Sequence, residues 1–111
     1  MDLANILITG SSGLVGAPLV TKLLRKSNLI IGLDPIINLE SNKKYKHISN
    51  PFKSIREFAS LFKKYDITKI IHTGGISGPM LANENPNLII ENNVFFTMHL
   101  IEAARIYKKI K

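Results

Sequence analysis

The sequence contains no cysteine and no tryptophan, and its apolar runs are short. Without cysteine, disulfide bonds and thiolate chemistry are excluded, which makes the cytoplasm the expected location. No apolar run approaches the roughly 20 residues that cross a bilayer, so no membrane contact is expected. A secretory leader is not expected either, because Asp2 stands where a leader is basic and the first apolar run ends at Gly10.

Acidic residues are also scarce, since 8 aspartates and glutamates face 15 lysines and arginines, for a net charge of +7. Such an excess could serve to bind nucleic acid. The lysines, however, form short separate groups, two of which fall at the C-terminal ends of expected helices, where cations complement the helix dipole. The groups are Lys43, Lys44 and Lys46; Lys63 and Lys64; and Lys108, Lys109 and Lys111. We therefore expect no nucleic-acid partner, an interpretation that a DNA-binding assay across a salt series would test.

Short apolar runs alternate with longer amphipathic segments along the chain. Strands are predicted over residues 3–9, 29–34, 45–49 and 69–73, and helices over 14–26, from Ser54 onward, and over 86–109. The middle helix has the clearest start, because Ser54 and Glu57 have the spacing of a capping box. Strands joined by helices pair in parallel with right-handed crossovers. We predict one α/β domain over residues 1–111, a Rossmann-type doubly wound parallel sheet truncated after about four β-α units.

Three glycines at every third position follow the first predicted strand: Gly10, Gly13 and Gly16 in the stretch TGSSGLVG. Gly10 lets the chain turn off the strand, Gly13 lacks a Cβ so that a pyrophosphate can approach, and Gly16 lets the helix pack tightly. The helix amides and the positive end of its dipole then face the phosphates. The residues predicted to bind a dinucleotide in this turn are Gly10, Ser11, Ser12, Gly13, Leu14, Val15 and Gly16, with the two serines as hydroxyl donors.

An acidic residue stands where a dinucleotide site needs one. Asp34 follows Gly16 by 18 residues, at the end of the second predicted strand. A carboxylate there accepts hydrogen bonds from the ribose hydroxyls of adenosine and repels a 2′-phosphate. The residues just after Asp34 include no arginine that could hold that phosphate. The pattern predicts NAD as the cofactor and favours it over NADP.

These motifs resemble the extended short-chain dehydrogenases/reductases, the NAD-dependent epimerase/dehydratase family, over nearly the whole chain. TGSSGLVG is similar to the family's TGxxGxxG, and the likeness continues through IIGLDP, IIHTGGISGP and NPNLIIENNVFFTMHLIEAAR. The family signature HxAA is similar to residues 72–75 here. The resemblance implies that the backbone of Thr73, Gly74 and Gly75 passes the adenosine and the nicotinamide-side ribose. His72 is interpreted as a structural histidine rather than a catalytic base.

Two further positions follow from the resemblance. Asn93 is similar to the asparagine of the NVxGT signature, which implies that it supports the catalytic lysine and its proton relay, although Phe96 replaces the family's glycine. The family's aspartate beside the adenine ring is missing, since His47 or Ser49 stands there. The Ile48 backbone amide is the predicted substitute for that contact. No metal site is predicted.

The tyrosine and lysine that carry the family's hydride-transfer chemistry belong after a fifth strand, and the chain ends before one. Tyr107 and Lys111 have YxxxK spacing, but they lie on the preceding helix, so we interpret the match as chance. The resemblance then implies the NAD-binding portion of an epimerase, dehydratase or dehydrogenase that acts on a sugar or nucleotide sugar, inactive on its own. The alternative is a non-catalytic dinucleotide sensor that resembles NmrA-like regulators, and the downstream sequence would discriminate the two.

The last predicted helix carries more apolar surface than one sheet face covers. Its apolar residues are Ile90, Val94, Phe95, Met98, Ile101, Ala104 and Ile106. In the family this helix is similar to part of a helical dimer interface, so a homodimer through residues 86–109 is expected.

Overall fold

The computed structural model describes residues 3–49, 54–74, 87 and 90–110. In chain order its elements are β1 (Ala4–Thr9), α1 (Gly16–Leu23), β2 (Ser27–Leu33), β3 (Tyr45–Ile48), α2 (Ile55–Tyr65), β4 (Lys69–His72), the π-helical turn η1 (Glu91–Phe95) and α5 (Phe96–Tyr107). Each strand that the sequence predicts is present, and so are the helices after the glycine-rich turn and after Ser54.

The four strands form one parallel sheet in the order β3-β2-β1-β4. The registers place Ile6 of β1 beside Ile30 of β2 and Lys69 of β4. Because all strands run the same way, their carboxyl ends meet at one edge, where ligands of such sheets bind. The predicted parallel α/β Rossmann-type fold is confirmed.

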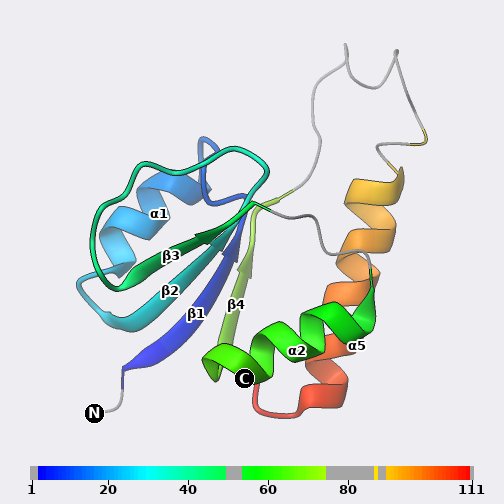
Figure 1. Ribbon diagram of the computed structural model, residues 1–111. Helices are drawn as coiled ribbons and strands as arrows, with labels where there is room; N and C mark the ends of the chain where they lie inside the picture. Colours follow the sequence, from blue (N-terminus) through cyan, green and yellow to red (C-terminus); the bar gives the residue numbers. More distant parts are fainter. Residues whose placement is uncertain (1–2, 50–53, 75–86, 88–89, 111) are drawn as a thin grey trace.

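Helices cover both faces of this sheet (Figure 1), which gives the chain two apolar clusters. On one face α1 places Val20 and Leu24 against Ile8 and Ile30. On the other face α2 and α5 pack side by side over Leu7 and Ile31. Strands buried on both faces read as continuous apolar runs, which is why the strand predictions from sequence succeeded.

Ser54 caps the start of α2, which confirms the Ser54 half of the predicted capping box. Ser54 Oγ accepts the amide proton of Glu57 at 3.1 Å, and the same hydroxyl contacts Glu57 Oε1 at 3.1 Å. The helix then buries Phe58 and Phe62 completely, and the Phe58 ring meets Phe96 of α5 edge to face at 5.2 Å. This contact joins the two helices on one face of the sheet.

Several element boundaries differ from prediction. Helix α1 covers Gly16–Leu23 rather than 14–26, because Gly13 N bonds Gly10 O in a separate turn and Lys26 N bonds Leu23 O as the helix ends. Strand β2 begins at Ser27, two residues early, where it pairs with Ala4. Helix α5 ends at Tyr107 because Lys108 adopts a left-handed conformation with φ 66°. The predicted start of the last helix, at residue 86, lies outside the described residues.

Candidate dinucleotide-binding site

The glycine-rich turn follows β1 at the carboxyl edge of the sheet and presses against the end of β4. Gly10 has φ +70°, which favours glycine, and its amide donates to Leu33 O at 2.8 Å. A Cβ on Gly10 would lie 2.7 Å from Gly74 N, and one on Gly16 would lie 2.0 Å from Gly10 O. Both glycines are therefore required by the packing of the turn itself, as predicted.

Gly13 differs from its two neighbours. It is exposed, and among the described residues the only atom within 4 Å of a Cβ there would be Gly10 O, at 3.4 Å. The fold alone does not require a glycine at this position. Helix α1 begins three residues later, at Gly16, with Val15 as its N-cap residue. The first amides of a helix have no acceptor within it, so open space close to a helix start fits a ligand's phosphate group.

Asp34 follows β2 and lies against this turn. Its carboxylate accepts two amide protons, from Ser12 N at 3.0 Å and from Ile36 N at 2.9 Å, one on each oxygen. Its own amide donates to Ile48 O at the end of β3, at 3.2 Å. An ionised carboxylate has about four lone-pair positions, so Asp34 keeps acceptor capacity for further donors. The structure thus brings Asp34, Ser12 and Ile48 together, as the sequence predicts.

The segment after Asp34 is tied to the turn by side-chain bonds. Ser12 Oγ donates to Ile36 O at 2.6 Å, and Asn38 Nδ2 donates to Ser11 O at 2.7 Å. Ser11 is fully buried, whereas the side chains of Leu14 and Val15 are exposed. Of the predicted turn residues, the two serines therefore hold the turn in place through these bonds.

The end of β4 closes the other side of the turn. Thr73 Oγ1 donates to Thr9 O at 2.6 Å, and Gly74 N donates to Thr9 Oγ1 at 3.0 Å. A Cβ on Gly74 would lie 3.1 Å from Thr9 Oγ1 and 3.2 Å from Gly10 N. Thr73 and Gly74 therefore adjoin Gly10, as expected of a shared site. Gly75, also predicted for this site, lies outside the described residues.

His72 connects the sheet to α5. Its Nδ1 lies 2.5 Å from Thr9 Oγ1 and its Nε2 lies 2.8 Å from Thr97 Oγ1, while its ring stacks on Phe96 at 5.8 Å. Burial lowers the pKa of His72 below its usual 6.5, which favours the neutral ring. With both nitrogens engaged, this histidine has the contacts of a structural residue, in line with the interpretation from sequence.

Asn93 is linked to His72 through the Thr97 hydroxyl. It is exposed in η1, and its carbonyl accepts a hydrogen bond from Thr97 Oγ1 at 3.2 Å. A π-helical turn inside a helix is often found at functional sites. The predicted role of Asn93 in supporting a catalytic lysine stays a prediction.

Tyr107 lies away from the glycine-rich turn. The Tyr107 ring packs on Phe62 at 5.8 Å, and its hydroxyl lies 3.5 Å from Asp66 Oδ1, at the opposite end of α2 from Ser54. Lys111 lies outside the described residues. Tyr107 therefore belongs to the contact between α2 and α5, which supports reading the YxxxK spacing as chance.

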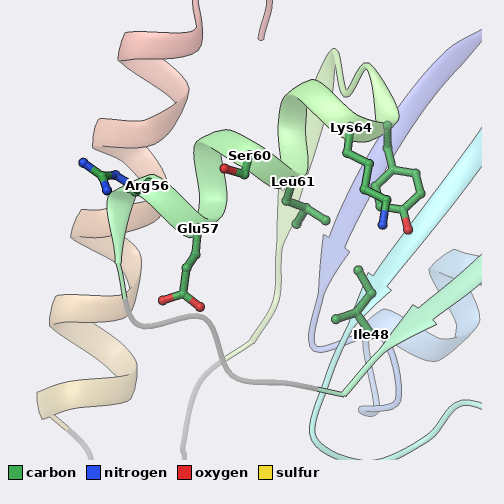
Figure 2. Close-up of a pocket in the computed structure, with 7 residues that line it drawn as sticks. Ile48, Arg56, Glu57, Ser60, Leu61 and Lys64 are labelled. Atoms are coloured by element: carbon green, nitrogen blue, oxygen red, sulfur yellow. The ribbon is translucent and has the colours of Figure 1, made fainter.

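A cavity of about 390 Å³ opens elsewhere, between α2 and the edge strand β3 (Figure 2). Its lining residues are Ile48, Arg56, Glu57, Ser60, Leu61, Lys64 and Tyr65. Of the predicted cofactor residues only Ile48 lines it, so this cavity is not the predicted site. Within the described residues no group of three or more histidine, aspartate and glutamate side chains could hold a metal ion.

Sequence reasoning missed two side chains that contact this site. Tyr45 Oη lies 3.0 Å from Ser11 Oγ, and His47 Nε2 lies 2.9 Å from the Asp34 carbonyl. The available signal was the spacing of two polar rings on alternate residues of β3, which places both on one face of the sheet. Gly32, the residue before the last in β2, was a second signal, since glycine inside a strand indicates close approach of another group.

The fold is that of a Rossmann domain with a glycine-rich turn between β1 and α1. The chain belongs to the NAD dependent epimerase/dehydratase family, whose model matches residues 6–111. No helix within the described residues is long and apolar enough to cross a membrane.

Three relatives illustrate the likeness. UDP-glucuronate 4-epimerase of Thermodesulfobacterium geofontis is 22% identical over 89% of this chain and 35% of its own length. UDP-glucuronic acid decarboxylase 2 of Arabidopsis thaliana is 27% identical over 91% of this chain and 23% of its own. The enzyme WbmF of Bordetella bronchiseptica, solved in complex with NAD+, has a TM-score of 0.84 at 25% identity over 99% of this chain and 34% of that one. The chain thus spans between 23% and 35% of these three proteins.

Proposed function

We propose that this chain binds NAD as the cofactor-binding portion of an oxidoreductase of the epimerase/dehydratase type, which acts on a sugar or nucleotide sugar by hydride transfer. One observation carries the proposal. The space beside Gly13 is open although the fold does not require a glycine there, and α1 begins three residues later, at Gly16. A missing side chain close to the start of a helix supports a ligand's phosphates at that position, because the first helix amides and the helix dipole favour an anion.

The chain's own residues divide the work of binding. The amides of Leu14, Val15 and Gly16 donate to the pyrophosphate, with the dipole of α1 adding positive potential. Asp34 accepts from the ribose hydroxyls of adenosine with the lone pairs that Ser12 and Ile36 leave free. When bound, NAD takes up and returns the hydride. Thr73 and Gly74 would line the path toward the nicotinamide, with Gly75 the next predicted residue of the site, and Ile48 would lie on the adenine side.

The substrate class rests on the relatives. UDP-glucuronate 4-epimerase and UDP-glucuronic acid decarboxylase 2 are named for UDP-sugar substrates. This supports a nucleotide sugar for the enzyme to which the chain contributes. The absence of cysteine supports a cytoplasmic location, which stays a prediction.

Titration of the chain with NADH, followed by nucleotide fluorescence, tests the proposal. Saturable binding with one nucleotide per chain, displaced by NAD, is the expected result. A chain that is folded by circular dichroism but leaves the NADH signal unchanged would contradict it.

We further propose that the chain forms a homodimer through α5 and the turn before it. Six large apolar side chains are exposed along this segment: Ile90, Val94, Phe95, Met98, Ile101 and Ile106. Four of them, at positions 90, 94, 98 and 101, recur at the spacing of one helical face. A second copy of the same helix is a fitting cover for such a stripe, because paired helices interlock their apolar side chains.

Replacing Ile101 by glutamate is expected to weaken the dimer roughly tenfold or more, since it puts a charge into an apolar contact. Ile37 offers a matched control, because its side chain is 65% exposed, close to the 63% of Ile101, but it lies outside this helix. Sedimentation of both variants measures the effect. A wild-type chain that sediments as a monomer at all concentrations would refute the dimer.

A further inference from the structure

Four groups from three segments form one hydrogen-bonded connection that begins at Ser11 in the glycine-rich turn. Tyr45 Oη lies 3.0 Å from Ser11 Oγ and 2.7 Å from His47 Nδ1, and His47 Nε2 lies 2.9 Å from the Asp34 carbonyl oxygen. Ser11 belongs to the turn, Tyr45 and His47 belong to β3, and Asp34 follows β2. The connection therefore links the two parts of the proposed NAD site, which are the glycine-rich turn and the segment that begins with Asp34.

The Asp34 carbonyl, at one end of the connection, determines which groups can donate hydrogen bonds along it. A backbone carbonyl only accepts, so His47 Nε2 carries the proton that is donated to Asp34. In the tautomer with its proton on Nε2, Nδ1 is left to accept from the Tyr45 hydroxyl, 2.7 Å away. Tyr45 Oη and Ser11 Oγ lie 3.0 Å apart, and each hydroxyl can both donate and accept. Each group in the connection has a partner.

Gly32 shows that the fold makes room for this connection. It lies in β2 between Ile8 of β1 and His47 of β3. A Cβ on Gly32 would lie 1.9 Å from Tyr45 Oη and 2.5 Å from Ser11 Oγ. Any other residue at this position would therefore separate Tyr45 from Ser11. Burial raises the pKa of Tyr45 above its usual 10.0, so its hydroxyl keeps its proton.

The connection acts on the atoms that would hold NAD. Ser11 is followed by Ser12, whose amide donates to Asp34 Oδ2, and His47 holds the main chain of Asp34 itself. We infer that Tyr45 and His47 are positioning residues, which fix the distance between the phosphate-binding turn and the ribose-binding carboxylate. This inference rests on the proposed function. It assigns a role in cofactor affinity to two β3 side chains that act through Ser11 and the main chain of Asp34.

Variants of the 111-residue chain test the inference through NAD affinity. His47→Ala and Tyr45→Phe are each expected to weaken NAD binding roughly tenfold, the usual effect of leaving a buried polar group unpaired. The double variant should be scarcely weaker than either single one, because both act through one connection. His47→Gln retains a donor for the Asp34 carbonyl and should recover part of the affinity. His99→Ala, on α5, is the matched control and should bind as the wild type does.

The 15N chemical shifts of the His47 imidazole in the wild-type chain test the inference without a variant. The expected result is that His47 carries its proton on Nε2, the nitrogen that faces the Asp34 carbonyl, and a ring with its proton on Nδ1 alone would overturn the inference. Additive losses in the double variant, or full NAD affinity in both single variants, would overturn it as well. A wild-type chain that does not bind NAD would instead refute the proposed function, so the two failures are distinguishable.

Discussion

Replacing Gly13 by valine is expected to weaken NAD binding by roughly a hundredfold while the chain stays folded, because the branched side chain fills the space proposed for the pyrophosphate. Among the described residues a Cβ here meets only Gly10 O, at 3.4 Å, so the fold tolerates it. Its backbone is not in the left-handed region that restricts Gly10, where φ is +70°. Calorimetric titration with NAD, together with far-UV circular dichroism, measures both effects.

Two companion variants separate the ligand effect from a folding effect. Gly13→Ala adds one methyl group and should give a smaller loss of affinity than valine. Gly16→Ala should instead damage the turn, since its Cβ would lie 2.0 Å from Gly10 O. If Gly13→Val bound NAD as tightly as the wild type, the phosphates would lie elsewhere and the proposed site would be wrong.

Discrimination between NAD and NADP is the second large effect. The wild-type chain should bind NAD roughly a hundredfold more tightly than NADP, because the Asp34 carboxylate would face the 2′-phosphate, and opposing like charges cost several kcal/mol. In the wild type the Asp34 carboxylate accepts from the amides of Ser12 and Ile36, at 3.0 and 2.9 Å. Asp34→Asn removes the charge but keeps one oxygen that can accept from one of these two amides. This variant should narrow the preference to about tenfold or less.

Parallel titrations of both nucleotides against wild type and Asp34→Asn decide the point. Asp34→Ala serves as the harsher comparison, since it also removes both amide contacts and should loosen the turn. Equal affinity of the wild-type chain for NAD and NADP would contradict the role given to Asp34.

The sequence was sufficient for the parts of the site that depend on local chain geometry. Gly10 and Gly16 could be assigned from their spacing because sharp turns and close helix packing require a missing Cβ wherever they occur. Asp34 could be placed because parallel strands end at one edge of the sheet. The start of α2 followed from Ser54, whose hydroxyl and backbone need only residues one turn away.

The parts that sequence reasoning missed depend on contacts between distant segments. Tyr45 and Ser11 are 34 positions apart, and they meet only because the order β3-β2-β1 and the gap at Gly32 bring them together. The connection from Thr9 through His72 to Thr97 likewise joins β1, β4 and α5. Helix ends were misjudged for a related reason. Apolar spacing extends past Leu23, but Ser27 already pairs with Ala4 in the sheet.

The most direct test of the central claim is the response of individual backbone amides to NAD in the 15N-labelled chain. The amides of Leu14, Val15 and Gly16 should show the largest shifts, with Asp34 next, because these groups would contact the pyrophosphate and the ribose. The amides of Ser60 and Lys64, which line the separate cavity between α2 and β3, should stay where they are. Shifts that gather around that cavity while residues 14–16 stay unchanged would contradict the account.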